Sequence, residues 1–186
     1  ADARGIPAVL DGLHGDGAAG DSIFGATIPA RSHGEVVRYY ALATDGVGQS
    51  DSWPNAAPSE FRAYTVGYEP PAIMINEVVA DNVAGLTDEA GEHEDWVELY
   101  NADNVVVDLE GMYLSDSFGS SRIWALPAHL LAPGEHLLIW ADKDLAQGPF
   151  HADLKFSAGG EDAVLFDTEL HGNTVVSGFT YGPVAA

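Results

Sequence analysis

One stretch of the sequence, residues 95–140, limits the possible fold more than any other. It begins DWVELYN, where Val97 and Leu99 fall on one side of an extended chain and Trp96, Glu98 and Tyr100 fall on the other. Further apolar runs follow at VVVDLEGMYLSD, RIWALP and HLLIWA, each bounded by turn residues and each too short for a buried helix of ordinary length. The pattern predicts a β-meander in which Val97 and Leu99 face the core.

The whole chain predicts an all-β fold in two parts. Residues 1–68 contain four predicted strands, which are IPAVL, IFGATIP, EVVRYYALAT and FRAYTVG, with a turn-rich loop at residues 45–60. Four strands are too few for a complete sandwich, so we interpret this part as the later portion of an immunoglobulin- or fibronectin-like domain. The EPP sequence at residues 69–71 predicts a stiff linker. Residues 72–186 predict eight or nine strands, from IMINEVVA through LKF and AVLFDT to VVSGFTYG, which are enough for a closed sandwich of two sheets.

Charge and composition exclude several classes of function. The chain has 29 acidic residues against 7 Lys and Arg, a formal net charge of −22, so it repels nucleic-acid phosphates and anionic membranes. We therefore expect no direct binding of nucleic acid, and no membrane insertion because no apolar run approaches spanning length. There is no Cys, which excludes disulfides, thiolate metal sites and a Cys nucleophile. With neither an initiating Met nor a signal peptide, the sequence is expected to be part of a longer chain with further domains.

Five motifs in a fixed order resemble the lamin tail domain, the immunoglobulin-like β-sandwich of nuclear lamins and of many bacterial exported proteins. The motifs are INEVVADN, DWVELYN, DLEGMYLSD, RIWALPAHLLAPGEHLLIWA and LKFSAGGEDAVLFDT, and they cover residues 72–181. The start and the acidic loop look more like the bacterial branch. The resemblance implies a non-catalytic structural or interaction module of a larger exported protein. It also implies an extracellular or cell-surface location and, as partner, a protein or a cell-surface polymer.

Two other functions stay open on the sequence. The aromatic residues of the meander and Trp53, in the predicted loop, would suit a carbohydrate- or peptide-binding module if they were exposed together. Bacterial lamin-tail-like domains also accompany nucleases, phosphatases and spore-coat-type kinase domains, so the chain could be an accessory fragment of a secreted hydrolase or kinase protein. Glu77 and Glu98, on strands that we expect to be adjacent, could form the carboxylate pair that hydrolysis requires, although exposed acidic residues are ordinary on a sandwich surface.

Two acidic loops are the candidate binding sites for a hard cation such as Ca²⁺. The candidate ligands are Asp11, Asp16 and Asp21 in the first loop and Asp81, Asp88, Glu92 and Asp95 in the second. In each loop glycines permit sharp turns, and the alternative is an ordinary solvated loop built on Asx turns. The GDGAAG sequence at residues 15–20 has the letters of a dinucleotide fingerprint, but a strand follows it where a helix is needed.

The histidines give no zinc signature. They stand at positions 14, 33, 93, 129, 136, 151 and 171, without the close spacing that metalloproteases use. We therefore expect surface histidines in turns and no zinc site.

Overall fold

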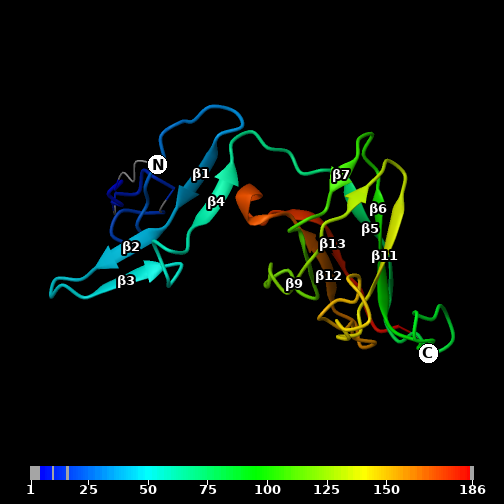
Figure 1. The fold of residues 1–186 in the computed structure, drawn as a ribbon. Coiled ribbons are helices and arrows are strands. Elements are labelled where there is room, and N and C mark those ends of the chain that lie inside the picture. The colour runs from blue at the N-terminus through cyan, green and yellow to red at the C-terminus, as the bar shows by residue number, and fades with distance from the viewer. Residues whose placement is uncertain (1–4, 10, 16, 185–186) are drawn as a thin grey trace.

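The computed structural model describes residues 5–9, 11–15 and 17–184, and its regular elements are antiparallel strands and one short 3₁₀ helix (Figure 1). Within these residues no helix has the length and apolar character needed to cross a membrane. The N-terminal strands lie beside the larger sandwich and project away from it (Figure 1).

The N-terminal part contains four strands, but they are not the four that the sequence predicts. β1 (Val36–Tyr39) pairs with β4 (Arg62–Thr65), and β2 (Ala41–Thr44) pairs with β3 (Ser50–Trp53). The long EVVRYYALAT strand therefore divides at Tyr40 into two strands with different partners. β3 lies within the predicted loop. The sequence does not predict this strand, because SDSW lacks the apolar alternation that marks a half-buried strand.

The first two predicted strands are wrong within the described residues. IPAVL and IFGATIP form only an isolated bridge, between Val9 and Gly25. Their large side chains remain exposed, for example Ile23 at 56% and Phe24 at 64%, so no core beneath them favours an extended pair. Apolar composition alone therefore did not determine a sheet here.

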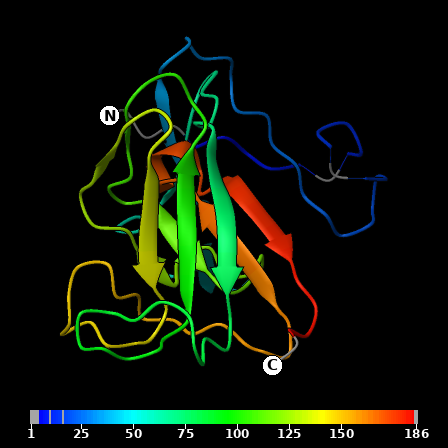
Figure 2. The same cartoon turned by 90° about the vertical axis from the view of Figure 1, so that its right-hand side faces the viewer.

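The second part is an immunoglobulin-like sandwich made chiefly of two sheets. One sheet has the order β11-β6-β5 and the other has the order β13-β12-β8-β9, while β7 and β10 form a separate pair. Figure 2 looks onto the three-stranded sheet, with β12 (orange) behind it and β13 (red) to the side of β5. The strand bounds are β5 Ile73–Val79, β6 Trp96–Asn101, β7 Val107–Asp108, β8 Tyr113–Ser115, β9 Trp124–Ala125, β10 Leu130–Leu131, β11 His136–Trp140, β12 Asp162–Phe166 and β13 Val175–Thr180. The 3₁₀ helix η1 spans Glu169–His171.

The core lies between these sheets, and the alternation in DWVELYN is confirmed. Val97 and Leu99 are fully buried, whereas Glu98 and Tyr100 on the other side of β6 are half-buried; Trp96, also on that side, is the exception and is buried. Other fully buried side chains of the same core are Leu109, Leu114, Leu131, Ile139 and Leu165. LKF is not a strand, because it contributes only the bridge between Asp142 and Lys155, although Leu154 and Phe156 are buried.

Candidate metal centre

The order of strands in the three-stranded sheet brings two distant loops to one end of the sandwich. Val79 at the end of β5, Trp96 at the start of β6 and Trp140 at the end of β11 are neighbours in register. The loop of residues 81–95 joins β5 to β6, and the loop of residues 141–153 follows β11, so both leave the same edge. We name them the acidic loop and the β11 loop.

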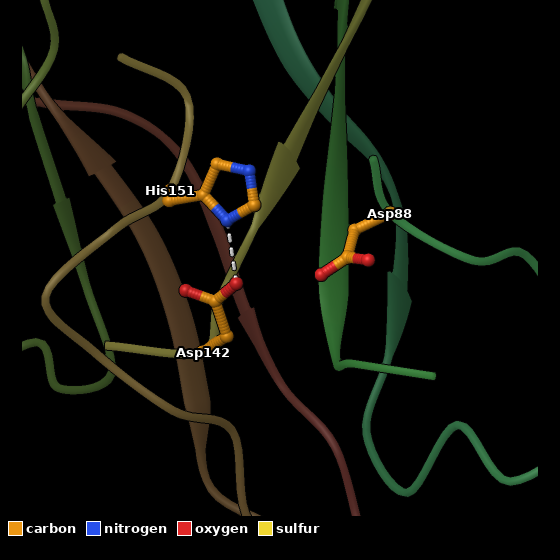
Figure 3. A group of neighbouring side chains, drawn as sticks. All are labelled: Asp88, Asp142 and His151. Carbon is orange, nitrogen blue, oxygen red and sulfur yellow. Dashed lines mark hydrogen bonds and ion pairs between the residues drawn. The ribbon is translucent and has the colours of Figure 1, made fainter. Parts of the chain in front are cut away.

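Three side chains from these loops form a compact group, shown in Figure 3. Asp88 comes from the acidic loop, and Asp142 and His151 come from the β11 loop. One potential ligand atom from each residue lies within 4.8 Å of the others. Carboxylate oxygens and an imidazole nitrogen together are a donor set that divalent metal ions use in proteins.

Asp88 is buried and uses only one of its carboxylate oxygens within the loop. Its Oδ1 accepts hydrogen bonds from the backbone N–H groups of Ala90 (2.9 Å) and Glu92 (2.8 Å). Gly91 supplies the left-handed backbone of this turn, with φ of 82°. Asp88 is 8% exposed, and its Oδ2 is buried without a hydrogen-bond partner among the described residues. Figure 3 shows this carboxylate directed toward Asp142 and His151.

Asp142 and His151 form a buried pair. The Oδ2 of Asp142 lies 2.6 Å from Nδ1 of His151, and the two side chains are 2% and 3% exposed. The Oδ1 of Asp142 accepts the N–H of Asp144 at 2.9 Å, so the carboxylate is held at both oxygens. On the other side of the ring, Nε2 of His151 lies 3.2 Å from Oε2 of Glu89, whose side chain is largely exposed.

The backbone of the β11 loop fixes the position of this pair. Trp140 donates its N–H to Phe150 O at 2.8 Å, and Ala152 donates to Trp140 O at 2.7 Å. Because Phe150 and Ala152, the residues on either side of His151, bond to Trp140 of β11, His151 is held beside this strand. The expectation that the histidines lie at the surface in turns is therefore wrong for His151, which is 2% exposed.

The electrostatics of the pair favour a positive charge on the ring. Burial lowers the pKa of His151, but the hydrogen bonds and the attraction of Asp142 and Glu89 outweigh burial and raise the pKa above its ordinary value. Carboxylates thus surround a site that stabilises a cation.

The other candidate ligands of the acidic loop lie outside this group of three. The Oδ1 of Asp95 accepts the N–H groups of Asp81 (2.8 Å) and Asn82 (3.4 Å). The Oε2 of Glu92 accepts Nε2 of Gln147 at 2.9 Å and so ties the acidic loop to the β11 loop. These contacts shape the two loops, and Ca²⁺ binding by Asp81, Glu92 and Asp95 stays a prediction.

In the N-terminal loop the carboxylates form local turns. Oδ1 of Asp11 accepts the N–H of Leu13 at 2.9 Å, and this bond is the main reason that the pKa of Asp11 is lowered. Asp21 accepts the N–H groups of Ala18 (3.0 Å) and Ile23 (2.9 Å). Asp16 lies outside the described residues. A Ca²⁺ site in this loop also stays a prediction.

The structure also shows where the predicted carboxylate pair and the tryptophans lie. Glu77 and Glu98 do lie opposite each other on β5 and β6, and Oε1 of Glu98 accepts Nδ2 of Asn76 at 2.6 Å. Trp96, Trp124 and Trp140 are buried, whereas Trp53 is 51% exposed, as expected.

Comparison with known proteins gave one family. The family model described as Lamin Tail Domain matches residues 68–183, well over half of the chain. The match spans every strand of the sandwich and both loops of the candidate site. A comparison with curated proteins found no similar sequence.

Proposed function

Because the chain belongs to the lamin tail domain family, we propose that it is a non-catalytic structural and interaction module of a larger exported bacterial protein. Its role is to hold the segment before the sandwich in a fixed orientation and so to position neighbouring domains. Its location is extracellular or at the cell surface, and its partner is a protein or a cell-surface polymer. The acidic surface supports solubility there and disfavours nucleic acid.

The observation that carries this proposal is the contact between β4 and η1. The ring of Tyr68 stacks on the ring of His171, with centroids 3.5 Å apart and planes at 15°. Thr65 Oγ1 donates to Leu170 O at 2.9 Å. Burial and the neighbouring Asp167 carboxylate raise the pKa of Tyr68, in keeping with a ring enclosed at this contact.

Ion pairs extend the same contact. Glu169 of η1 lies 2.7 Å from Arg122 of the sandwich and 4.0 Å from Arg62 of β4. Figure 1 shows η1 beside β4. A spacer that fixes orientation needs such directional contacts on both sides of its linker, because a proline linker alone leaves domains free to rotate.

The carboxylate geometry also favours a non-catalytic role. A general acid and base need carboxylates free to exchange protons with a substrate. Glu98 is instead engaged by Asn76 across the strand pair. Assays for esterase, phosphatase and nuclease activity are expected to show none, and activity abolished by Glu98→Gln would contradict the proposal.

Rigidity of the contact can be measured directly. Since the chain has no Cys, spin labels can be placed at Val47→Cys and Val105→Cys, both exposed positions. A narrow distance distribution is expected, broadened by Tyr68→Ala and unchanged by Tyr40→Ala, a matched exposed tyrosine. A broad distribution in the unsubstituted background would refute the spacer role.

Calcium stiffening of the acidic loops belongs to the same proposal. In the acidic loop, the candidate oxygen donors outside the group of Asp88, Asp142 and His151 are Asp81, Glu92 and Asp95, and carboxylates are hard ligands of the kind that Ca²⁺ prefers. Calorimetric titration is expected to show binding at millimolar Ca²⁺ or below. A flat titration would remove calcium from the proposal without affecting the spacer role.

A second candidate function is a carbohydrate- or peptide-binding module. A hollow of about 550 Å³ lies where the N-terminal part meets the sandwich, and its lining includes Tyr39, Trp53, Arg62 and Arg122. The Arg62 guanidinium lies 4.9 Å from the centroid of the Trp53 ring. The aromatic faces suit a sugar or peptide, and the two arginines, which also pair with Glu169, can donate hydrogen bonds to it. Glycan and peptide arrays that show binding lost in Trp53→Ala would favour this function, and silence on both would dismiss it.

A further inference from the structure

We propose that Asp88, Asp142 and His151 bind a divalent transition-metal ion of the zinc class, which joins the acidic loop to the β11 loop. The inference does not depend on the proposed spacer function, because the spacer contact is made by η1, between β12 and β13 of the other sheet, and involves neither of these loops. It differs from the calcium prediction in both ligands and metal. Asp142 and His151 have no part in the calcium prediction, and Asp88 moves from the calcium set to this one.

The donor set selects the class of metal. Ca²⁺ and Mg²⁺ take oxygen ligands almost exclusively, whereas an imidazole nitrogen with carboxylates suits Zn²⁺, Co²⁺ or Mn²⁺. The group provides one nitrogen from His151 and oxygens from Asp88 and Asp142. A site of this composition, with three protein ligands, leaves a fourth position for water.

The buried oxygen of Asp88 is the independent reason to place a cation here. Most buried carboxylate oxygens in proteins have a hydrogen-bond partner, because an unpaired buried charge is costly. Oδ2 of Asp88 has none among the described residues, although Oδ1 of the same carboxylate accepts two N–H groups. A cation between the two loops would satisfy Oδ2 without altering the turn that holds Oδ1.

The ligand atoms would bind one ion after movements of about 1 Å. Two ligands of one zinc ion are separated by about 3–4 Å, since each bond is about 2.0–2.2 Å long. The atoms of the group lie within 4.8 Å of one another, so the acidic loop would have to approach the β11 loop by about 1 Å. Nδ1 of His151 and Oδ2 of Asp142 are 2.6 Å apart, so these two atoms would lose the proton between them and separate by about 1 Å to bind the same ion.

The surroundings of the group would support a bound ion. With the metal on Nδ1, the N–H on Nε2 of His151 remains to donate to Glu89, now 3.2 Å away, and such an outer carboxylate orients a ligating imidazole. The backbone bonds of Trp140 hold the β11 loop in place before any metal arrives. A site on fixed elements loses little entropy when the ion binds.

The proposal is tested on the whole chain, freed of metal with EDTA and titrated with ZnCl₂, and with CoCl₂ as a spectroscopic probe. One Zn²⁺ per chain is expected, with a rise in melting temperature and a change in the fluorescence of Trp140, whose ring lies 6.5 Å from His151. Co²⁺ should give visible absorption bands of a four-coordinate site. Asp88→Asn and His151→Gln should each weaken Zn²⁺ binding at least tenfold.

Matched controls separate this site from chance binding by surface residues. His136→Gln changes an exposed histidine, and Asp81→Asn changes an exposed acidic residue of the same loop, so both should bind Zn²⁺ as the unsubstituted chain does. Asp88→Asn keeps the shape of the side chain and an acceptor for the turn. Its melting temperature in EDTA should therefore equal or exceed that of the unsubstituted chain, while the rise caused by Zn²⁺ disappears.

Three results would overturn the proposal. The first is no saturable Zn²⁺ binding, and the second is binding that Asp88→Asn leaves unchanged. The third is Ca²⁺ that competes with Zn²⁺ at equal concentration, which would indicate an oxygen-only site elsewhere in the acidic loop. None of these results would change the expected rigidity of the contact between β4 and η1.

Discussion

Asn101, the last residue of β6, provides the sharpest test of how the sandwich is stabilised. Its side chain is fully buried and every polar atom is used. Nδ2 donates to Val105 O at 2.9 Å and to Leu131 O at 2.8 Å, and Oδ1 accepts the N–H of Asp103 at 2.8 Å. The side chain thus joins the end of β6 to the following turn and to β10.

The magnitude follows from these three contacts. A hydrogen bond within a protein contributes about 1 kcal/mol net, and a buried group left unpaired costs about 1–3 kcal/mol. Asn101→Ala removes three bonds and takes a donor from each of two carbonyl oxygens, so we expect a loss of about 3 kcal/mol. Asn101→Asp should cost at least as much, because an anionic oxygen then faces the carbonyl groups of Val105 and Leu131.

Urea unfolding followed by tryptophan fluorescence measures this loss. With a slope of about 1.5–2 kcal/mol/M, the midpoint should fall by about 1.5–2 M at unchanged slope. Asn104→Ala, three residues along the chain and exposed, should move the midpoint by less than about 0.3 M. A loss below about 1 kcal/mol for Asn101→Ala would refute the account of Asn101 as a buried connector.

Two further predictions concern the C-terminal edge of the sandwich. Gly160→Ala should lower the free energy of unfolding by at least about 2 kcal/mol, because φ is 92° and an added Cβ would lie 2.6 Å from Tyr181 O. Gly182→Ala, which has open space around it, should change it almost not at all in the same urea assay. Burial raises the pKa of Glu161 above its ordinary value of 4.5. The stability linked to its protonated form is therefore complete below the unfolded pKa and is lost as pH rises through the folded pKa. Glu161→Gln should remove that loss, so its melting temperature relative to the unsubstituted chain should rise from pH 4 to pH 7, and a constant difference would contradict the reasoning.

The sandwich could be predicted from the sequence because its strands carry their own signal. In DWVELYN, alternation distinguishes the side that faces the core, and the burial of Val97 and Leu99 follows that alternation. The turn at Leu131 to Gly134 could be placed for the same reason, since Pro and Gly mark where the apolar run must end. A core that both sheets share makes each such local preference consistent with the whole.

The N-terminal part could not be predicted as well, because little of it is buried. Among the described residues of this part, the buried apolar side chains are Val37 in β1, Ala63 in β4 and Pro54 after β3. β2 is exposed throughout, so its residues give no alternation to read. Without a core to select the register, backbone pairing and turns determine where the strands begin. The apolar pattern of the sequence predicts neither the pairing nor these turns.

The candidate metal centre shows a different limit. The density of carboxylates predicts a cation site in the acidic loop and includes Asp88, but density does not tell which carboxylate is buried. Asp142 and His151 lie in a loop without strand pattern or metal-binding spacing, so nothing in their local sequence distinguishes them.

What brings the three residues together is strand order. Once β11 and β5 are known to flank β6 with Trp96 opposite Trp140, the acidic loop and the β11 loop must leave the same edge. Burial of His151 then follows from the backbone bonds at Trp140, which place the imidazole under the loop. The topology alone reduces the seven histidines to two, His93 in the acidic loop and His151 in the β11 loop, and burial then selects His151. The acidic residues of this chain therefore acquire a specific chemistry only where the fold places a nitrogen donor among them.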